Sequence, residues 1–222
     1  MVAWGILVTH RLLAALALGA AVSTTGCFDD ISTEFAPGLE PLEPNEAPLP
    51  DEPSRLSIVS GDGENYMWAH GRGFVPASPA AVWEAAKDAS VMVHVCASDE
   101  QTVETDVDPD YEYSFEVHYV VDTIVTVEWD ELWRFGTVVG SPTDPSLALV
   151  RYQKVYGSDA ITLLEGSVQV LSTDDPEIAE VQFVEHVEAF GGSTEDLRRS
   201  MAYRFDALLA SLGEGGAPRC ID

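Results

Sequence analysis

Hydrophobic and polar residues alternate along several segments of the chain, and this two-residue period predicts β-strands. In the segment 113–121, one face carries Tyr113, Phe115, Val117, Tyr119 and Val121. The same period, or an apolar run between turn residues, marks 65–75, 123–135, 147–156, 161–171 and 178–190. Short connections from residue 113 onward favour consecutive antiparallel strands. A brief apolar run at 91–96 is read as a possible further strand.

Two segments follow a helical period instead. Ser78 and Pro79 supply an N-cap and a proline at the first helical position, which predicts a short helix. A second helix starts at Ser193, where Asp196 gives a capping-box-like pattern. Its apolar stripe consists of Leu197, Met201, Phe205, Leu208 and Leu212. A long helix with one apolar face, following serial strands, is expected to pack across their sheet.

The N-terminal segment predicts export. His10 and Arg11 precede an apolar run at 12–22, which is too short to cross a bilayer as a helix, since that takes roughly 20 residues. Its length is typical of a signal-peptide core, with a buried Ala/Leu helix as the alternative. The ending Thr25-Gly26-Cys27 resembles the lipobox of bacterial lipoproteins. That resemblance implies a signal peptide at 1–26, lipidation of Cys27 and a membrane-anchored protein of the bacterial cell envelope, in the periplasm or at the cell surface. A secreted, unlipidated protein is the alternative.

Residues 27–54 are predicted to be an acidic, proline-rich tether. The stretch 28–54 holds six of the 13 prolines and eight acidic residues but no basic residue. Such a composition buries too little apolar surface to offset its ordering entropy, and like charges keep it extended. An arm that follows the domain surface through Phe35, Leu39 and Leu42 is the alternative.

The segment from Gly73 to Asp88, with Ala-Ser-Pro leading into a helix that carries Val82 and Trp83, resembles the opening of START-related helix-grip proteins of the SRPBCC superfamily. The entry into the last helix at 191–197 agrees with it. The resemblance covers roughly 65–212 and implies an α+β fold, in which a curved antiparallel sheet wraps around the long C-terminal helix. It places the domain at 55–213, with a tail at 214–222, and implies a cavity for a hydrophobic ligand.

Composition restricts the partners. The 222 residues include 38 Asp+Glu and 11 Lys+Arg, a net charge of −27, while 46% hydrophobic residues exclude disorder of the whole chain. Binding to nucleic acid or electrostatic binding to an anionic membrane needs clustered Lys and Arg, which the sequence lacks. No nucleic-acid partner is therefore expected.

The cysteines and the acidic run are expected to have structural rather than catalytic roles. Cys96 and Cys220 form an even pair in an exported chain, and we expect a disulfide between them, with two free thiols as the alternative. In a helix-grip fold, the end of the long helix lies near the region of Cys96. An Asp-x-Asp-x-Asp-x-Glu run at 106–112 lacks the EF-hand pattern and is read as a solvated acidic loop rather than a calcium site. The histidines show no local metal-ligand spacing, and no metal or cofactor is expected.

Candidate ligand contacts come from the strands and the last helix: Trp129, Trp133, Arg151, His118, Phe183, His186, Met201 and Phe205. Core packing is the alternative for the aromatic residues. An inward Arg151 would suit a ligand carboxylate or phosphate, whereas an outward one would pair with a carboxylate of the protein.

No nucleophile, oxyanion hole or nucleotide-binding motif is present, so no catalytic residue is assigned. We expect a monomer, anchored to a membrane through Cys27, that binds a hydrophobic small molecule or lipid without chemistry. A cyclase- or hydratase-type enzyme is the first alternative, and it requires His118, His186, Glu185 or Arg151 to converge in the cavity. A surface module whose acidic loop meets a basic partner is the second.

Overall fold

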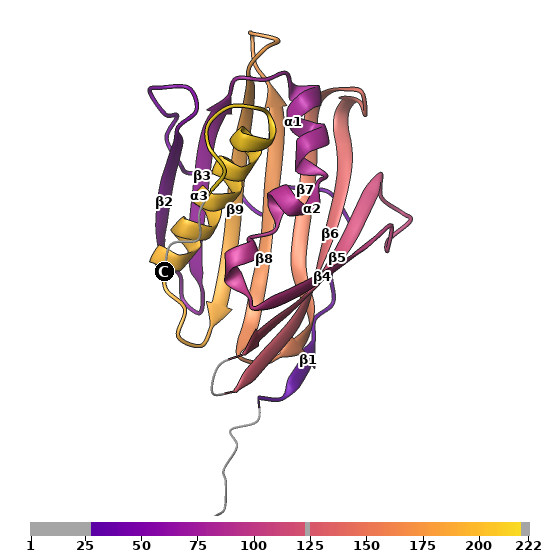
Figure 1. Ribbon diagram of the computed structural model, residues 1–222, viewed down its shortest axis with the longest axis vertical. Helices are drawn as coiled ribbons and strands as arrows, with labels where there is room; N and C mark the ends of the chain where they lie inside the picture. Colours follow the sequence, from indigo (N-terminus) through magenta and orange to yellow (C-terminus); the bar gives the residue numbers. More distant parts are fainter. Residues whose placement is uncertain (1–27, 123–124, 219–222) are drawn as a thin grey trace, which may run out of the picture.

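The computed structural model describes residues 28–122 and 125–218, and this part of the chain contains one curved, nine-stranded antiparallel sheet (Figure 1). Its strands are β1 (Asp30–Ser32), β2 (Leu56–Asp62), β3 (Met67–Val75), β4 (Glu100–Thr105), β5 (Tyr113–Asp122), β6 (Thr126–Ser141), β7 (Asp144–Ser158), β8 (Ile161–Ser172) and β9 (Ala179–Ala189). The order is β2-β3-β9-β8-β7-β6-β5-β4, while β1 pairs with the end of β7. The strands β5 to β9 are paired in chain order, so the predicted meander is confirmed.

The helices lie against one face of the sheet (Figure 1). They are α1 (Pro79–Ala86), the short α2 (Ala89–Met92) and the long α3 (Thr194–Ser211). Both predicted starts are confirmed, because Ser78 Oγ accepts from the Ala81 N–H at 3.3 Å and Ser193 Oγ accepts from the Asp196 N–H at 3.2 Å. α3 crosses β2, β3 and β9, and the predicted helix-grip arrangement is confirmed.

One local prediction is wrong, and some strands were not predicted. The segment 91–96 is not a strand, because Asp88 caps α2 and a 3₁₀ turn follows at Val95–Ala97. Strands β2 and β4 were not expected from the sequence. β4 is an edge strand that is mostly exposed, so its polar sequence lacks the apolar alternation of the other strands.

The alternating strand residues divide between two faces. The inner face, under the helices, carries Phe115, Trp133, Phe135, Phe183 and other buried residues of one hydrophobic core. α3 lies close to β3 because Gly71 has no side chain there, and a Cβ at this position would collide with the Met201 sulfur. Met201 and Phe205 are consequently packed directly against the sheet.

The N-terminal segment lies along the outer face of the sheet. It therefore has the form of the surface arm considered as the alternative, and not of a free tether. β1 pairs with Tyr156–Ser158, and the Thr33 N–H bonds to the Val155 carbonyl at 2.9 Å. The Phe35 ring lies 4.0 Å from the Arg134 guanidinium, and Leu42 donates its N–H to Ser167 Oγ at 3.0 Å. We call residues 28–49 the arm.

Farther along the arm, the Asn45 amide donates to the carbonyls of Gly71 and Phe183, both at 2.9 Å. Leu39 packs onto Gly136 of β6, so each of the three apolar residues considered from the sequence has a place on the sheet or beside it. Proline content and charge therefore did not prevent ordering, because specific side chains and backbone groups of the outer face bind the arm. Cys27 and the signal-like segment before it lie outside the described residues. Among the described residues, the helices lack the length and apolarity that a membrane-spanning helix needs.

Candidate ligand-binding cavity

A cavity of about 560 Å³ lies between α3 and the inner face of the sheet. Its apolar lining comes from both sides: Tyr119, Trp129, Leu164 and Val187 from the strands, and Leu197 from α3. Small-molecule sites have volumes of roughly 300–1,000 Å³ and are mostly apolar, with a few polar groups. The cavity has the dimensions and the lining of such a site.

Glu131 is the first polar group of this cavity. It is only 3% exposed, and its carboxylate accepts hydrogen bonds from the indole N–H groups of Trp129 at 2.9 Å and Trp133 at 3.3 Å. The Tyr119 hydroxyl lies 3.4 Å from the same carboxylate. Burial raises the pKa of Glu131, and these hydrogen bonds and the charge of Arg204 only partly oppose that effect.

Arg204 of α3 supplies the positive charge that pairs with Glu185, the second buried carboxylate of the cavity. Its guanidinium makes two contacts with Glu185 of β9, Nη2 to Oε1 at 3.0 Å and Nη1 to Oε2 at 3.3 Å. Nη1 also donates to the Tyr152 hydroxyl at 2.7 Å. Tyr152 fits because Gly166 on the neighbouring strand has no side chain to collide with its ring. Arg204 Nε is buried without a hydrogen-bond partner.

The aromatic residues around this polar group are stacked in pairs. The Tyr119 and Trp129 rings have centroids 4.7 Å apart with an interplanar angle of 8°, and Trp133 stacks on Tyr152 at 4.1 Å. His94, which lines the cavity, contacts the Tyr203 ring at 4.3 Å. Burial, assisted by the charge of Arg204, lowers the pKa of His94 to about 4. His94 is therefore neutral at neutral pH.

The predicted ligand contacts separate into three groups, one in the cavity lining, one in the core beside it and one on the outer face of the sheet. Trp129 lines the cavity, and Glu185 does so as well. The remaining apolar candidates belong to the buried core beside the cavity, without lining it: Trp133, Phe183, Met201 and Phe205.

The polar candidates His118, Arg151 and His186 lie on the outer face of the sheet and not in the cavity, which corrects their placement. Each alternates with inward residues such as Val117, Tyr152 and Val187 on its own strand. His118 bonds to Asp130 at 2.7 Å, and Arg151 donates to the Glu40 carbonyl of the arm at 3.1 Å. The alternation indicated which residues share a face, but it did not indicate which face is concave.

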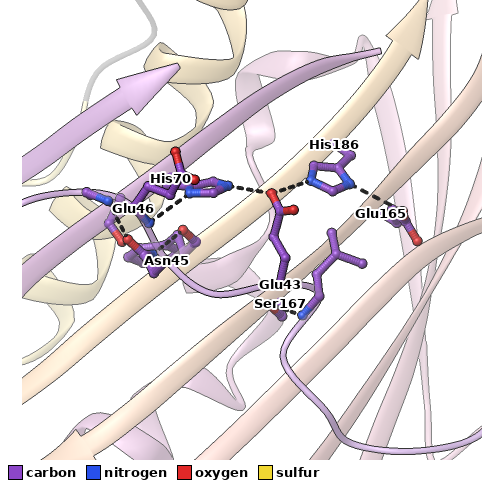
Figure 2. A network of polar contacts seen from close by, with 11 residues as sticks. Glu43, Asn45, Glu46, His70, Glu165, Ser167 and His186 are labelled. Atoms are coloured by element: carbon purple, nitrogen blue, oxygen red, sulfur yellow. Dashed lines mark hydrogen bonds and ion pairs between the residues drawn. The ribbon is translucent and has the colours of Figure 1, made fainter. Parts of the chain in front are cut away.

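The outer face carries a second polar group, which we call the arm clasp: Glu43, His70, Glu165 and His186 (Figure 2). Glu43 Oε1 lies 2.7 Å from His70 Nε2 and 3.0 Å from His186 Nε2. His186 Nδ1 faces Glu165 at 3.4 Å. The clasp therefore joins the arm to β3, β8 and β9.

Electrostatics favour charged forms in the clasp. Burial lowers the pKa of His186, but the contacts with Glu165 and Glu43 outweigh it, so the pKa lies above the ordinary value of 6.5. Burial likewise raises the pKa of Glu43, and its hydrogen bonds with His186 and His70 outweigh this, so that the pKa lies below 4.5. An imidazolium between two carboxylates stabilises the bound arm.

Glu43, His70 and His186 also have the residue types of a zinc site, with ligand atoms within 4.8 Å of one another. However, the backbone N–H of Glu46 donates to His70 Nδ1 at 2.9 Å (Figure 2). Because a backbone N–H is only a donor, Nδ1 must be the acceptor and carries the lone pair of the neutral ring. The ring proton is therefore on Nε2, facing Glu43. Nε2 then has no lone pair for a metal, and we interpret the group as a hydrogen-bonded clasp.

The acidic run and the cysteines have structural contacts. Asp108 pairs with Arg134 at 2.8 Å and Glu112 with Lys87 at 3.0 Å, so the run is not simply a solvated loop. Cys96 is disulfide-bonded. Its predicted partner Cys220 lies outside the described residues, and the pairing stays a prediction.

Sequence reasoning missed Glu131, His94 and Arg204 as cavity residues. Glu131 could have been recognised from the sequence, because it is an acidic residue on the apolar strand face that carries Trp129 and Trp133. Arg204 is three residues after Met201, which places it on the buried side of α3. An ionisable group on the apolar side of an element is thus the pattern that would have identified both.

No family model and no curated protein sequence matches this chain. Solved structures match its fold. Human STARD10 superposes with a TM-score of 0.50 and 9% identity over 71% of each chain. Zhui aromatase/cyclase from Streptomyces sp. R1128 gives a TM-score of 0.45 and 12% identity, covering 72% of this chain and 94% of that one. The human StarD13 lipid transfer and protein localization domain gives 0.44 and 12%, covering 70% and 81%. The chain has the helix-grip α+β fold of START-like proteins.

Proposed function

We propose that the protein is an exported, lipid-anchored helix-grip domain that binds a hydrophobic small molecule or lipid without chemical conversion. The observation that carries the binding role is the cavity of about 560 Å³ beneath α3, with an apolar lining and a few buried polar groups. Burial of an apolar ligand there is favourable by about 25 cal/mol for each Å² removed from water.

The placement of the polar residues supports binding over catalysis. The enzyme alternative needs several of His118, His186, Arg151 and Glu185 in the cavity, and only Glu185 lines it. Glu185 is itself held by Arg204. An acid or base engaged in a bidentate ion pair is poorly suited to exchange protons with a substrate.

Native mass spectrometry of the purified protein tests the binding role. A bound apolar molecule that co-purifies, or uptake of an added one, is the expected result. Absence of both co-purification and uptake would contradict the proposal.

Export and anchoring are supported by the lipobox-like sequence before Cys27. The contacts of the arm begin at Phe28, whose ring centroid lies 6.2 Å from that of Phe190, and the Asp29 N–H bonds to Asp159 at 3.2 Å. A lipidated Cys27 would therefore hold the domain directly against the bilayer, without a long spacer. Fractionation of cells that express the full chain tests this: the wild type is expected with membranes and Cys27→Ser in the soluble fraction. Equal distribution of the two would contradict anchoring.

A further inference from the structure

Glu131 is a buried carboxylate without a cationic partner of its own. The three groups that bond to it, from Trp129, Trp133 and Tyr119, are all neutral donors. Neutral donors satisfy the lone pairs of a carboxylate but do not balance its charge. Among the described residues, no Lys, Arg or His forms an ion pair with Glu131. The inner end of the cavity therefore presents an acidic group with which no cation of the described residues pairs. Burial raises its pKa, and an ammonium group beside it would favour its ionised form.

Arg204 does not change this balance. Its two Nη atoms are occupied by Glu185 and Tyr152, so its charge is matched by the carboxylate of Glu185. His94 is neutral at neutral pH. Two carboxylates and one guanidinium thus line the buried part of the cavity.

The charged residues at the rim of the cavity also carry a net negative charge. Asp196 and Asp206 line it together with Arg199, and Arg199 lies 3.5 Å from Glu195 outside the lining. A cavity whose lining carries a net charge, with walls of low dielectric constant, concentrates ligands of opposite charge, and here four carboxyl groups stand against two guanidinium groups. The whole chain, with a net charge of −27, adds to this effect.

Aromatic faces complete the environment of a cation. Tyr119 and Trp129 stack on each other and both line the cavity beside Glu131. A cation within about 6 Å of an aromatic centroid is stabilised by the ring quadrupole, most strongly by tryptophan. Leu164, Val187 and Leu197 supply apolar surface for the remainder of a ligand.

We propose that the cavity selects amphiphiles whose head group is a protonated amine over alcohols and carboxylates with the same apolar chain. This inference rests on the proposed function, since it specifies the ligand of the same cavity. The ammonium group donates to Glu131 and lies against the stacked pair, while the apolar chain follows the aliphatic lining. A carboxylate head group would repel the ionised form of Glu131, and the nearby Arg204 cation is already paired with Glu185.

Competition with the neutral dye Nile red tests the selectivity at neutral pH. The purified protein is loaded with the dye and titrated with decylamine, decanol and decanoate. Decylamine is expected to displace the dye at a concentration at least about tenfold lower than decanol, with decanoate weakest. Equal affinities, or tighter binding of decanoate, would overturn the inference and leave the binding role intact. Failure of Nile red and all three compounds to bind would overturn the binding role as well.

The variant Glu131→Gln tests whether the selectivity for amines depends on the Glu131 carboxylate. In Glu131→Gln the ratio of decylamine to decanol affinity should fall toward one. Because both affinities are measured on the same variant, a uniform loss of affinity leaves the ratio unchanged. The matched control is Glu177→Gln, an exposed residue before β9 that does not line the cavity, and it should keep the wild-type ratio. A wild-type ratio in Glu131→Gln would overturn the role of Glu131.

Discussion

Arg204 on α3 and Glu185 on β9 form a bidentate ion pair at the cavity wall, with N···O distances of 3.0 and 3.3 Å. Both side chains are at least nine-tenths buried. The pair links the long helix to β9 at the wall of the cavity. Its neighbours Tyr152 and Trp133 stack on each other beside it.

Removing one member of this pair should destabilise the fold strongly. Arg204→Met leaves Glu185 as a buried charge without a partner, and such losses cost about 3–5 kcal/mol. The measurement is urea unfolding of the variant and the wild type. The double variant Arg204→Met/Glu185→Leu should recover part of the loss, because no unpaired charge remains.

An exposed pair provides the control. Arg55 and Glu52 lie 2.7 Å apart with side chains 73% and 64% exposed, so Arg55→Ala should change the unfolding free energy by about 1 kcal/mol or less. Similar costs for Arg55→Ala and Arg204→Met would contradict the structural role given to the buried pair.

Attachment of the arm should depend on pH through His186 and Glu43. The pKa of His186 is raised on folding, so its contribution is complete below 6.5 and is lost as the pH rises through the folded-state value. The pKa of Glu43 is lowered, so its contribution is complete above 4.5 and is lost as the pH falls through the folded-state value. The clasp is therefore strongest between these two pH values.

Amide hydrogen exchange at Leu42 and Glu46, whose N–H groups bond to Ser167 and His70, reports the opening of the arm. Exchange should be best protected at mildly acidic pH, and His186→Gln should increase it there more than at pH of about 8. His118→Gln, on the same face but away from the arm, is the matched control. A constant effect of His186→Gln across this range would contradict the ionic clasp.

Zinc should not bind the clasp stoichiometrically. The Glu46 N–H fixes the proton of His70 on Nε2, so a metal would have to displace either that proton or the arm backbone. Thermal unfolding with equimolar zinc, and again with a chelator, should give unchanged Tm values. A rise in Tm with stoichiometric zinc uptake would show that the ring takes the other tautomer.

The disulfide of Cys96 is predicted to join Cys220, which would close a loop of more than 100 residues. Closing a loop of this length with a disulfide stabilises the folded state by about 4–5 kcal/mol in the chain-entropy model, and often by less in practice. Peptide mapping without reduction should identify a Cys96–Cys220 peptide, and reduction should lower the unfolding midpoint. A mapped peptide that joins Cys96 to Cys27 would contradict the pairing.

The strand meander and the long helix could be predicted because burial on one side imposes a period on the sequence. The edge strand β4 escaped prediction because Glu100, Gln101 and Thr102 show no apolar period. The arm was only the alternative to a free tether, because its attachment depends on single contacts, such as Phe35 with Arg134, and not on a continuous apolar pattern.

The candidate site could be predicted only in part for a related reason. The two-residue period grouped Trp129 with Trp133 on one face, but the strand at 178–190 was predicted without assigning His186 to a face. Which face of each strand meets α3 depends on the curvature of the whole sheet, which a single strand does not encode. Trp129 therefore lies in the cavity lining, whereas His186 lies under the arm.

Nile red titration of a matched pair of variants tests whether the space beneath α3 holds an apolar ligand. Ala202 lines the cavity, whereas Ala210 lies on the same helix outside the lining, and both are partly exposed. The wild type and Ala210→Trp should bind the dye saturably with a blue-shifted emission, and Ala202→Trp should weaken binding by at least about tenfold because the indole fills the space. Equal dye binding by Ala202→Trp and Ala210→Trp, or no saturable binding by the wild type, would contradict the binding role.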